Sequence, residues 1–391
     1  MSPHIHPIQC IIPPHMNKNI VENGTPEQRR KAMDSIASSA SLRAQRAVFT
    51  EIDALVRPVI VGEKQRHIFN ANHGSSLPGT LVREEDEPPT GDLAVDEAYD
   101  GSGATYDLFM EEYQRNSIDG KGMRLDSTVH YQTGYDNAFW NGRQMVYGDG
   151  DEDLPEPQRL FNRFTIALDI IGHELTHGVT QFEANLVYRD QPGALNESFS
   201  DVFGSLVKQR LRSQTAAEAD WIIGEGLFTP NVNGVGIRSM KAPGTAYDDP
   251  VLGKDPQPAH MNDYKDVPYD NGGVHINSGI PNHAFYITAM EMGGHAWEKA
   301  GSIWYVTLRD RLTSTSIFAD AALQTYLVAG SLYGDGSLEQ QAVRAGWSTV
   351  GISIEDGDGG NGDDGNGDGQ GCSFVLVQFL DSIKALIENR S

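Results

Sequence analysis

Two histidines and a glutamate with the spacing of a metal-binding motif stand near the middle of the chain. His173 and His177 are four positions apart, and Glu174 directly follows the first histidine. Residues four apart in a helix lie on the same face, so both imidazoles can reach one metal ion. Zinc is the usual ion for this pattern, and the neighbouring carboxylate can then act as a general base in hydrolysis. Because five residues can match by chance, the motif needs support from the rest of the chain.

A pair of acidic residues follows, in a second run with helical character. Glu197 and Asp201 are also four positions apart and therefore share a face of that helix. Hydrolytic zinc sites use three protein ligands, commonly two histidines and one glutamate, and leave one position for water. We therefore predict His173, His177 and Glu197 as the ligands of one zinc ion. Asp201 is expected to accept the free N–H of a zinc-bound histidine and so to fix its tautomer.

The elements that must position these residues are indicated by the pattern of apolar and turn-forming residues. Residues 164–177 form an apolar run suited to a helix, and a second helical run begins at Gly193. Residues 67–160 are rich in short β-like stretches between turn signals, whereas residues 161–352 show mainly helical patterns. The sequence thus predicts an α+β protein with a β-rich lobe and a mainly helical lobe. The zinc helix lies where they join, a usual place for a cleft.

Six motifs in order along the chain carry a resemblance to a known family. They are Asn137-Ala-Phe-Trp-Asn, Met145-Val-Tyr-Gly-Asp-Gly-Asp, His173-Glu-Leu-Thr-His, Gly193-Ala-Leu-Asn-Glu-Ser, Arg238-Ser-Met and Asp270-Asn-Gly-Gly-Val-His-Ile-Asn-Ser-Gly. From about residue 67 to 351, the chain resembles the thermolysin family of zinc metalloproteases, the gluzincins, which have a two-lobed fold. Its start, with Ile11-Ile-Pro-Pro, resembles the protealysin-like subgroup, whose members carry a short propeptide. The resemblance implies a zinc-dependent neutral endopeptidase made as an inhibited precursor.

The resemblance also assigns catalytic roles. Glu174 corresponds to the general base that takes the water proton and passes it to the departing amine, which contributes roughly 10²–10⁴-fold to the rate. His275 and Tyr188 correspond to the two donors to the oxyanion, and Asp270 to the acid that holds the histidine. From the residues alone, His275 would be a structural histidine and Tyr188 a packed aromatic side chain. The two glycines before His275 permit a tight turn.

Further positions correspond to the family's substrate-binding residues. Arg238 matches an arginine that binds a substrate carbonyl, and Asn137 and Ala138 match a strand that aligns the substrate backbone by added-strand pairing. Four apolar residues match the pocket for the residue after the scissile bond, which implies a preference for a bulky hydrophobic residue there. They are Ile170, Ile223, Leu227 and Ile237. Without the resemblance, these four would be ordinary core residues, and Arg238 would form a structural salt bridge.

The chain departs from the family where many members bind a pair of calcium ions. Asp169, Asp220 and Glu225 match calcium ligands, but Lys208 and Ile222 stand where glutamates are expected. The ammonium group of Lys208 could neutralise the remaining carboxylates in place of a cation. We therefore expect one zinc ion per chain and a stability that depends little on calcium.

Composition limits the partners and the location of the protein. The 391-residue chain has a formal net charge of −24, which disfavours nucleic acid and anionic membranes as partners. No apolar stretch is long enough to cross a membrane, and residues 1–7 lack the basic and apolar regions of a secretory signal peptide. We expect peptide and protein substrates, a monomer, and either a cytoplasmic location or secretion by another route.

Five segments are expected along the chain. Residues 1–57 would form the propeptide, residues 58–180 the first catalytic lobe ending in the zinc helix, and residues 181–352 the helical catalytic lobe. Residues 353–371 would form a flexible linker, because residues 355–371 are Gly, Asp and Asn almost throughout. Residues 372–391 would form a short amphipathic tail.

The expected propeptide contains a stretch favourable to helix, residues 26–49, which Thr25 could cap. The segment around Pro13-Pro14 is expected to lie near the active-site cleft and to inhibit the enzyme. Cleavage within residues 50–66 would then release it. Cys10 raises a further alternative, in which its thiolate binds the zinc directly.

Other functions remain as alternatives at this point. An aminopeptidase would use the same zinc ligands, but the sequence shows no separate signature for capture of an N-terminal amine. A zinc-bound protein without activity would be expected to lack Glu174, His275 or Tyr188, all of which are present. A binding function of the tail would concern only residues 372–391 and could coexist with catalysis.

Overall fold

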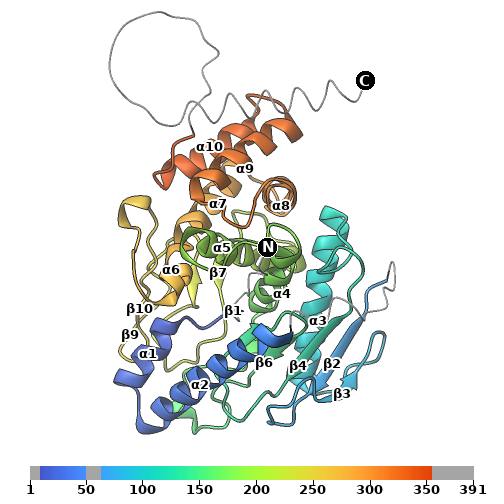
Figure 1. The fold of residues 1–391 in the computed structure, drawn as a ribbon, viewed down its shortest axis with the longest axis vertical. Helices are drawn as coiled ribbons and strands as arrows, with labels where there is room; N and C mark the ends of the chain where they lie inside the picture. The colour runs from blue at the N-terminus through green and yellow to red at the C-terminus, as the bar shows by residue number, and fades with distance from the viewer. Residues whose placement is uncertain (1–8, 50–62, 355–391) are drawn as a thin grey trace, which may run out of the picture. The chain divides into compact units, whose positions relative to one another are not determined.

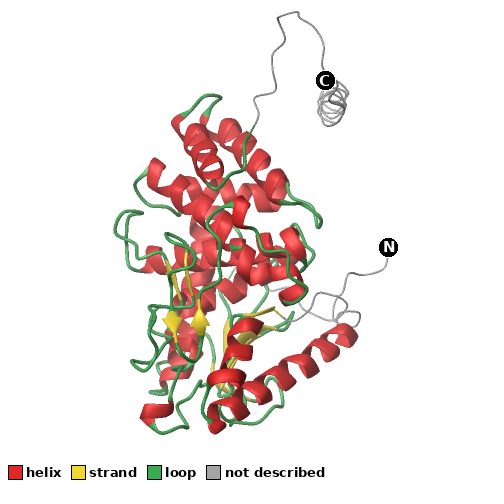
Figure 2. Ribbon diagram, turned by 90° about the vertical axis from the view of Figure 1, so that its left-hand side faces the viewer, coloured by secondary structure: helices red, strands yellow, loops and turns green. Residues whose placement is uncertain are grey.

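The computed structural model describes residues 9–49 and 63–354. The expected tail, nearly all of the expected linker and most of the expected cleavage region lie outside these residues. The described part combines a mixed β-sheet, formed by its N-terminal half, with helices that make up most of its C-terminal half (Figure 1, Figure 2). The predicted α+β arrangement with two lobes is therefore confirmed. None of the described helices has both the length and the apolar character needed to span a membrane.

Six strands form one sheet in the order β1-β5-β6-β4-β2-β3. Their bounds are β1 (Gln9–Cys10), β2 (Arg66–Asn70), β3 (Thr80–Arg83), β4 (Leu125–Val129), β5 (Ala138–Trp140) and β6 (Met145–Tyr147). Strands β2, β4 and β6 are parallel neighbours, whereas β3, β5 and β1 pair antiparallel to theirs. The carboxyl ends of the three parallel strands consequently lie at the same edge of the sheet.

The helices largely follow the predicted pattern. Their bounds are α1 (Pro14–Asn23), α2 (Pro26–Phe49), α3 (Leu93–Asp107), α4 (Leu168–Phe182), α5 (Asp190–Leu211), α6 (Asp270–Asn277), α7 (Gly279–Met292), α8 (Lys299–Asp310), α9 (Phe318–Tyr333) and α10 (Leu338–Thr349). Thr25 caps α2 as predicted, because its Oγ1 accepts the Gln28 N–H while Gln28 Oε1 accepts the Thr25 N–H.

Two predictions about helices need correction. The zinc helix α4 begins at Leu168 rather than at Phe164, because Phe164–Ile166 form a separate 3₁₀ turn. The segment between α5 and α6 contains no α-helix but four two-residue strands in turn-rich chain. They are β7 (Ile222–Ile223), β8 (Arg238–Ser239), β9 (Asp248–Asp249) and β10 (Gly253–Lys254). Several glycines in this stretch have a positive φ, which interrupts helical geometry.

Helices α4 and α5 approach each other closely at two glycines. A Cβ on Gly172 would lie 3.0 Å from the Cα of Gly204, and a Cβ on Gly204 would lie 2.4 Å from the Asp169 carbonyl oxygen. Neither position can therefore carry a side chain without separating the helices. The close crossing brings the side chains of α5 within reach of the histidines on α4.

Candidate active site

Three side chains from α4 and α5 converge in the protein interior. His173 Nε2 lies 3.6 Å from Glu197 Oε2, and His177 Nε2 lies 3.5 Å from Glu197 Oε1. All three side chains are fully buried, yet both Nε2 atoms and Glu197 Oε2 lack a hydrogen-bond partner among the described residues. Because buried polar atoms are nearly always paired in proteins, two imidazole nitrogens and a carboxylate left together in this way fit a zinc ion.

The other ring nitrogens of the two histidines are held by α5. His173 Nδ1 lies 2.8 Å from Asp201 Oδ1, while His177 Nδ1 lies 2.9 Å from both Asn196 Oδ1 and Ser200 Oγ. These contacts turn the Nε2 atoms of both histidines toward the carboxylate of Glu197. Sequence reasoning anticipated Asp201 but missed Asn196 and Ser200, although both lie one position before an acidic residue that it singled out.

The protonation of the histidines suits metal binding. Burial lowers the pKa of His173 to about 4 and that of His177 to about 3, so both imidazoles are neutral near pH 7. Burial alone would raise the pKa of Asp201, but Arg238 and His173 hold it well below its usual value. A permanently ionised Asp201 is the carboxylate that orients a histidine ligand in many metal sites.

Arg238 approaches the site through Asp201. Its Nε and Nη2 donate to the two carboxylate oxygens of Asp201 at 2.8 and 2.7 Å. The guanidinium is fully buried, and its Nη1 has no partner among the residues that the structure covers. The sequence left two roles open for Arg238, a structural salt bridge and binding of a substrate carbonyl. The geometry allows both, because Nε and Nη2 form the salt bridge and Nη1 stays available to a ligand.

Glu174 lies on α4 beside the histidines and is also fully buried. Its Oε2 accepts the backbone N–H of Trp140 on β5 at 3.0 Å, while its Oε1 has no partner among the described residues. Burial, and then the charge of Glu197, raise the pKa of Glu174 well above its usual value. A bound cation would lower this pKa again, so the carboxyl group is suited to exchanging protons.

His275, Tyr188 and Asp270 lie next to the same cluster. Asp270 accepts the backbone N–H of His275 at 3.0 Å, and its Oδ1 lies 2.6 Å from His275 Nδ1. The preceding Gly272 and Gly273 have φ of 85° and 78°, which provides the tight turn expected from the sequence. The Tyr188 hydroxyl lies 3.2 Å from His275 Nε2 and donates to Glu197.

The charge of His275 is set by its neighbours. Burial lowers its pKa, but the Asp270 and Glu197 carboxylates outweigh this effect and raise the pKa to about 9. His275 is therefore an imidazolium near pH 7 and can donate from Nε2 to an oxygen atom.

Asn137 directly precedes the strand β5, which begins at Ala138, and residues 9–12 of the same chain lie along this strand. β1 pairs antiparallel with β5, and the Ile11 N–H donates to the Ala138 carbonyl at 3.2 Å. The Ile12 N–H donates to Asn137 Oδ1 at 3.1 Å. The Cys10 carbonyl oxygen lies 3.0 Å from His275 Nε2. A peptide thus occupies the track along which the sequence predicts a substrate.

The thiol of Cys10 points elsewhere. Its Sγ donates to Ser39 Oγ at 3.8 Å, and the side chain packs with Tyr131, Tyr135 and Phe139. Cys10 does not belong to the group of His173, His177 and Glu197 that could hold a metal ion. The alternative in which Cys10 thiolate binds the zinc is therefore wrong for this structure, because its carbonyl rather than its thiol faces the site.

The four residues predicted for the hydrophobic pocket are all fully buried and belong to the main core cluster, as do Ile11 and Ile12 of the N-terminal segment. They are Ile170, Ile223, Leu227 and Ile237. Ile223 and Ile237 are neighbours, since the Ile237 N–H donates to the Ile223 carbonyl at 2.8 Å. Burial of this kind suits both a pocket wall and an ordinary core.

At the position matching the family's calcium pair, an ammonium group sits among the carboxylates. Lys208 Nζ lies 2.8 Å from both Asp169 Oδ2 and Asp220 Oδ1, and it donates to the Ile222 carbonyl at 2.6 Å. Glu225 instead pairs with Arg212 at 2.8 Å. Lys208 is nearly inaccessible to solvent, so its positive charge faces the two aspartates from within the protein and offsets part of their negative charge.

Known proteins share both halves of this architecture. The family model described as "Thermolysin metallopeptidase, catalytic domain" matches residues 59–181, and that described as "Thermolysin metallopeptidase, alpha-helical domain" matches residues 184–352. The "Extracellular metalloprotease" of Pectobacterium carotovorum subsp. carotovorum is 49% identical over 89% of this chain and 97% of its own length. "Protease PrtS" of Photorhabdus sp. (strain Az29) is 47% identical over 89% of this chain and 93% of its own.

A solved structure is similar over nearly the same extent. The structure titled "Precursor of Protealysin, Metalloproteinase from Serratia proteamaculans" is 50% identical and superposes with a TM-score of 0.79. The match covers 88% of this chain and all of the other. The chain therefore belongs to the thermolysin family of metallopeptidases and is a zinc metalloendopeptidase.

Proposed function

We propose that this chain is the inhibited precursor of a neutral endopeptidase with Glu174 as general base. The observation that carries the proposal is the peptide segment that lies along β5 beside the metal-type donors. Residues 9–12 pair with the edge of β5, and the Cys10 carbonyl faces His275. The chain continues on both sides of this segment, so the edge of β5 accepts the interior of a polypeptide. That arrangement favours an endopeptidase over an aminopeptidase, which must enclose a free terminus.

His173, His177 and Glu197 would hold the zinc ion. When bound, zinc lowers the pKa of a water molecule to about 7 and polarises the substrate carbonyl. Glu174 has one oxygen anchored by Trp140 and one free, so it takes the proton of the attacking water and later gives it to the departing amine.

The charge that develops on the substrate oxygen needs donors. Protonated His275 donates from Nε2, and the Tyr188 hydroxyl lies beside it. Asp270 keeps the imidazolium in place and charged. Removal of one such donor typically costs about 2.7–4 kcal/mol of transition-state stabilisation. The free Nη1 of Arg238 binds a substrate carbonyl, and Asn137 and Ala138 align the substrate backbone as they now align residues 11 and 12.

We further propose that the hydrophobic pocket selects a bulky apolar residue after the scissile bond. The four fully buried aliphatic side chains that match this pocket support the preference. A pocket of this kind discriminates by roughly 1–3 kcal/mol per methylene group, so Leu or Phe is favoured over Ala at this position.

The N-terminal segment is proposed to be an inhibitory propeptide, comprising residues 1–57. Its contacts reach both halves of the protein. On one side, Gln28 Nε2 donates to the Gln158 carbonyl at 2.8 Å. On the other, Asn19 Nδ2 donates to the Leu252 carbonyl at 2.8 Å, and His15 Nε2 lies 3.0 Å from the Tyr247 hydroxyl. These contacts hold residues 9–12 across the site until cleavage. The names of two similar proteins, the precursor of protealysin and the extracellular metalloprotease, support the proposal that this chain is a secreted zymogen.

The test is cleavage of a quenched-fluorescence peptide with Leu after the scissile bond. The full chain and its Glu174→Gln variant are compared after activation, each with and without a zinc chelator. We expect the parent to cleave, the chelator to abolish cleavage, and the variant to retain zinc but lose activity by at least 10²-fold. A matched peptide with Ala in place of Leu should be cut more slowly.

Two controls locate the inhibition. Deletion of residues 1–50 from the unprocessed chain should raise activity, and adding the deleted peptide back should lower it. If a zinc-loaded, processed chain cleaves no peptide, the assignment of Glu174 as base fails. If it releases single N-terminal residues only, the endopeptidase assignment fails.

A further inference from the structure

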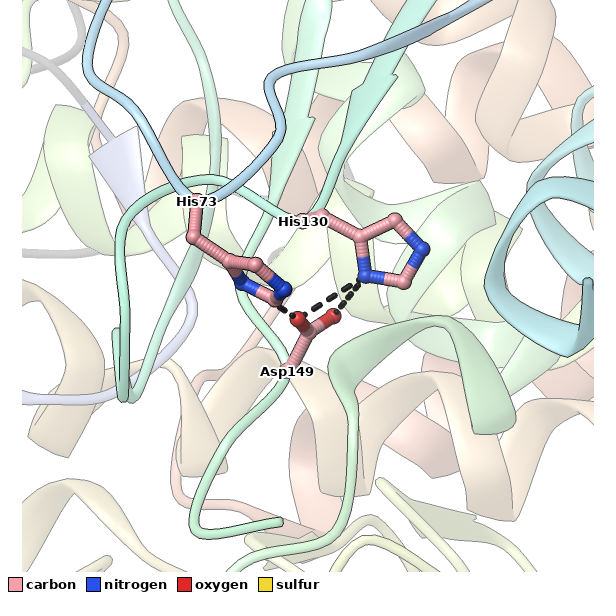
Figure 3. Close-up of side chains that lie close together, drawn as sticks. All are labelled: His73, His130 and Asp149. Atoms are coloured by element: carbon pink, nitrogen blue, oxygen red, sulfur yellow. Dashed lines mark hydrogen bonds and ion pairs between the residues drawn. The ribbon is translucent and has the colours of Figure 1, made fainter. Parts of the chain in front are cut away.

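A second group of metal-type donors lies outside the active site. His73, His130 and Asp149 each offer a ligand atom, and these three atoms all lie within 4.8 Å of one another. His130 Nδ1 lies 2.9 Å from both oxygens of Asp149, and His73 Nδ1 lies 3.5 Å from Asp149 Oδ2. Figure 3 shows the three side chains pointing toward one another from three separate loops. None of them takes part in the catalytic arrangement.

The sheet topology explains why these residues meet. β2, β4 and β6 are adjacent and parallel, and they end at Asn70, Val129 and Tyr147. His73, His130 and Asp149 follow those ends by one to three residues, so all three loops leave the same edge of the sheet. Ligand sites in α/β proteins commonly lie outside the carboxyl ends of parallel strands. The loops are also bonded to each other, since the His73 N–H donates to the His130 carbonyl at 2.9 Å.

A fourth residue holds His130 in a metal-binding orientation. Asp92 caps α3, and its Oδ1 accepts the N–H groups of Ala94 and Val95. Its other oxygen lies 3.0 Å from His130 Nε2. A carboxylate that accepts one ring N–H fixes the tautomer and turns the other nitrogen toward a metal. Here the other nitrogen is Nδ1, which faces Asp149 and His73.

We propose that His73, His130 and Asp149 bind a second divalent metal ion of the zinc class, oriented by Asp92. Two imidazoles and one carboxylate match the donor preference of zinc and its neighbours rather than that of calcium or magnesium, which take oxygen ligands. The His73 side chain is 56% exposed, so the site is open to solvent. A bound metal would tie together the three loops that leave the parallel strands.

A proton is the competitor for this site. Hydrogen bonding to Asp149 outweighs burial, and together with Asp92 it raises the pKa of His130 to about 9. Without metal, His130 is therefore an imidazolium held between the carboxylates of Asp149 and Asp92. The experiment has to distinguish these two arrangements.

The experiment counts zinc per chain. The full-length protein carries Glu174→Gln in every sample, which prevents self-digestion and keeps the catalytic ligands. Samples are dialysed against buffered free zinc at pH 8, and the bound metal is measured by plasma mass spectrometry. The compared variants are His73→Ala, Asp149→Asn and, as a matched control, His67→Ala. His67 lies near the start of β2, at the other end of the strand from the loop that carries His73, and it is not part of the cluster.

We expect two equivalents of zinc in the parent and in His67→Ala, but one in His73→Ala and in Asp149→Asn. His73 is exposed, so its removal should leave the melting temperature of the metal-free protein nearly unchanged. One equivalent in the parent would overturn the proposal and leave His130 as part of an ion pair. A second equivalent that persists in both His73→Ala and Asp149→Asn would also overturn it, because the ion would then bind elsewhere.

Discussion

Replacement of Lys31 by methionine should release the N-terminal segment from the catalytic domain. Lys31 extends from α2, and its side chain is only 2% exposed. Its Nζ lies 2.7 Å from Asp151 Oδ1, 2.6 Å from Asp153 Oδ1 and 3.9 Å from Asp136 Oδ1. It also donates to the Gly150 carbonyl at 3.1 Å. One ammonium group from the N-terminal segment thus lies among three aspartate side chains of the rest of the protein.

The magnitude follows from the burial of this cluster. Removing one partner of a buried ion pair typically costs about 3–5 kcal/mol, because the remaining charge loses its counter-charge. Burial, and then Asp151, raise the pKa of Asp136 well above its usual value. Asp136 can therefore take up a proton when Lys31 is lost, which places the cost near the lower end of that range. About 3 kcal/mol corresponds to roughly a 100-fold weaker docking equilibrium.

Arg30→Met provides the matched control, because it removes a cation from the next position of the same helix. Arg30 pairs with Glu27 and Asp34, and all three side chains are exposed. Exposed ion pairs contribute about 0–1 kcal/mol, so docking should change by less than about fivefold.

The assay is digestion of the N-terminal segment by an added protease in the Glu174→Gln background. When opening and reclosing are fast relative to cleavage, the digestion rate follows the open fraction. We expect digestion about 100-fold faster for Lys31→Met than for the parent, with little change for Arg30→Met. Equal rates for the two variants, with the catalytic domain still folded by its melting temperature, would refute the role of Lys31 as a buried anchor.

Two further predictions concern the cation sites. Asp201→Asn should weaken zinc binding about 10–100-fold, because the group that orients His173 loses the charge that Arg238 stabilises. Competition with a chelator measures the zinc affinity. The control variant Asp270→Asn should leave this affinity unchanged. The Lys208→Glu variant should melt at a lower temperature than the parent without calcium, because Asp169 and Asp220 lose their positive partner. Added calcium should restore its melting temperature. A parent that is itself strongly stabilised by calcium would contradict the proposed role of Lys208.

The sequence determined the parts of the site that depend on local geometry. A spacing of four residues places His173 and His177 on one face of α4, and Glu197 and Asp201 on one face of α5, wherever these helices lie. The turn before His275 was likewise visible as a pair of glycines. Helical periodicity and glycine's freedom at positive φ act over a few residues, so the motif carries this information by itself.

The tertiary structure decided how separate segments meet. The distance between the zinc helices depends on Gly172 and Gly204, whose importance appears only when α4 and α5 cross. Cys10 was a candidate ligand by residue type, but strand pairing with β5 turns its carbonyl to His275 and its thiol into an aromatic cluster. Residue type alone cannot tell which group of a residue faces a site.

The cluster of His73, His130 and Asp149 is the clearest case of information held by the fold. The three residues are far apart in sequence and follow no recognised spacing. They meet because β2, β4 and β6 pair in parallel and end at one edge of the sheet, while Asp92 reaches His130 from the start of α3. Strand order depends on packing across the whole domain, and it therefore decided this juxtaposition, whereas the catalytic motif was already set by the repeat of a single helix.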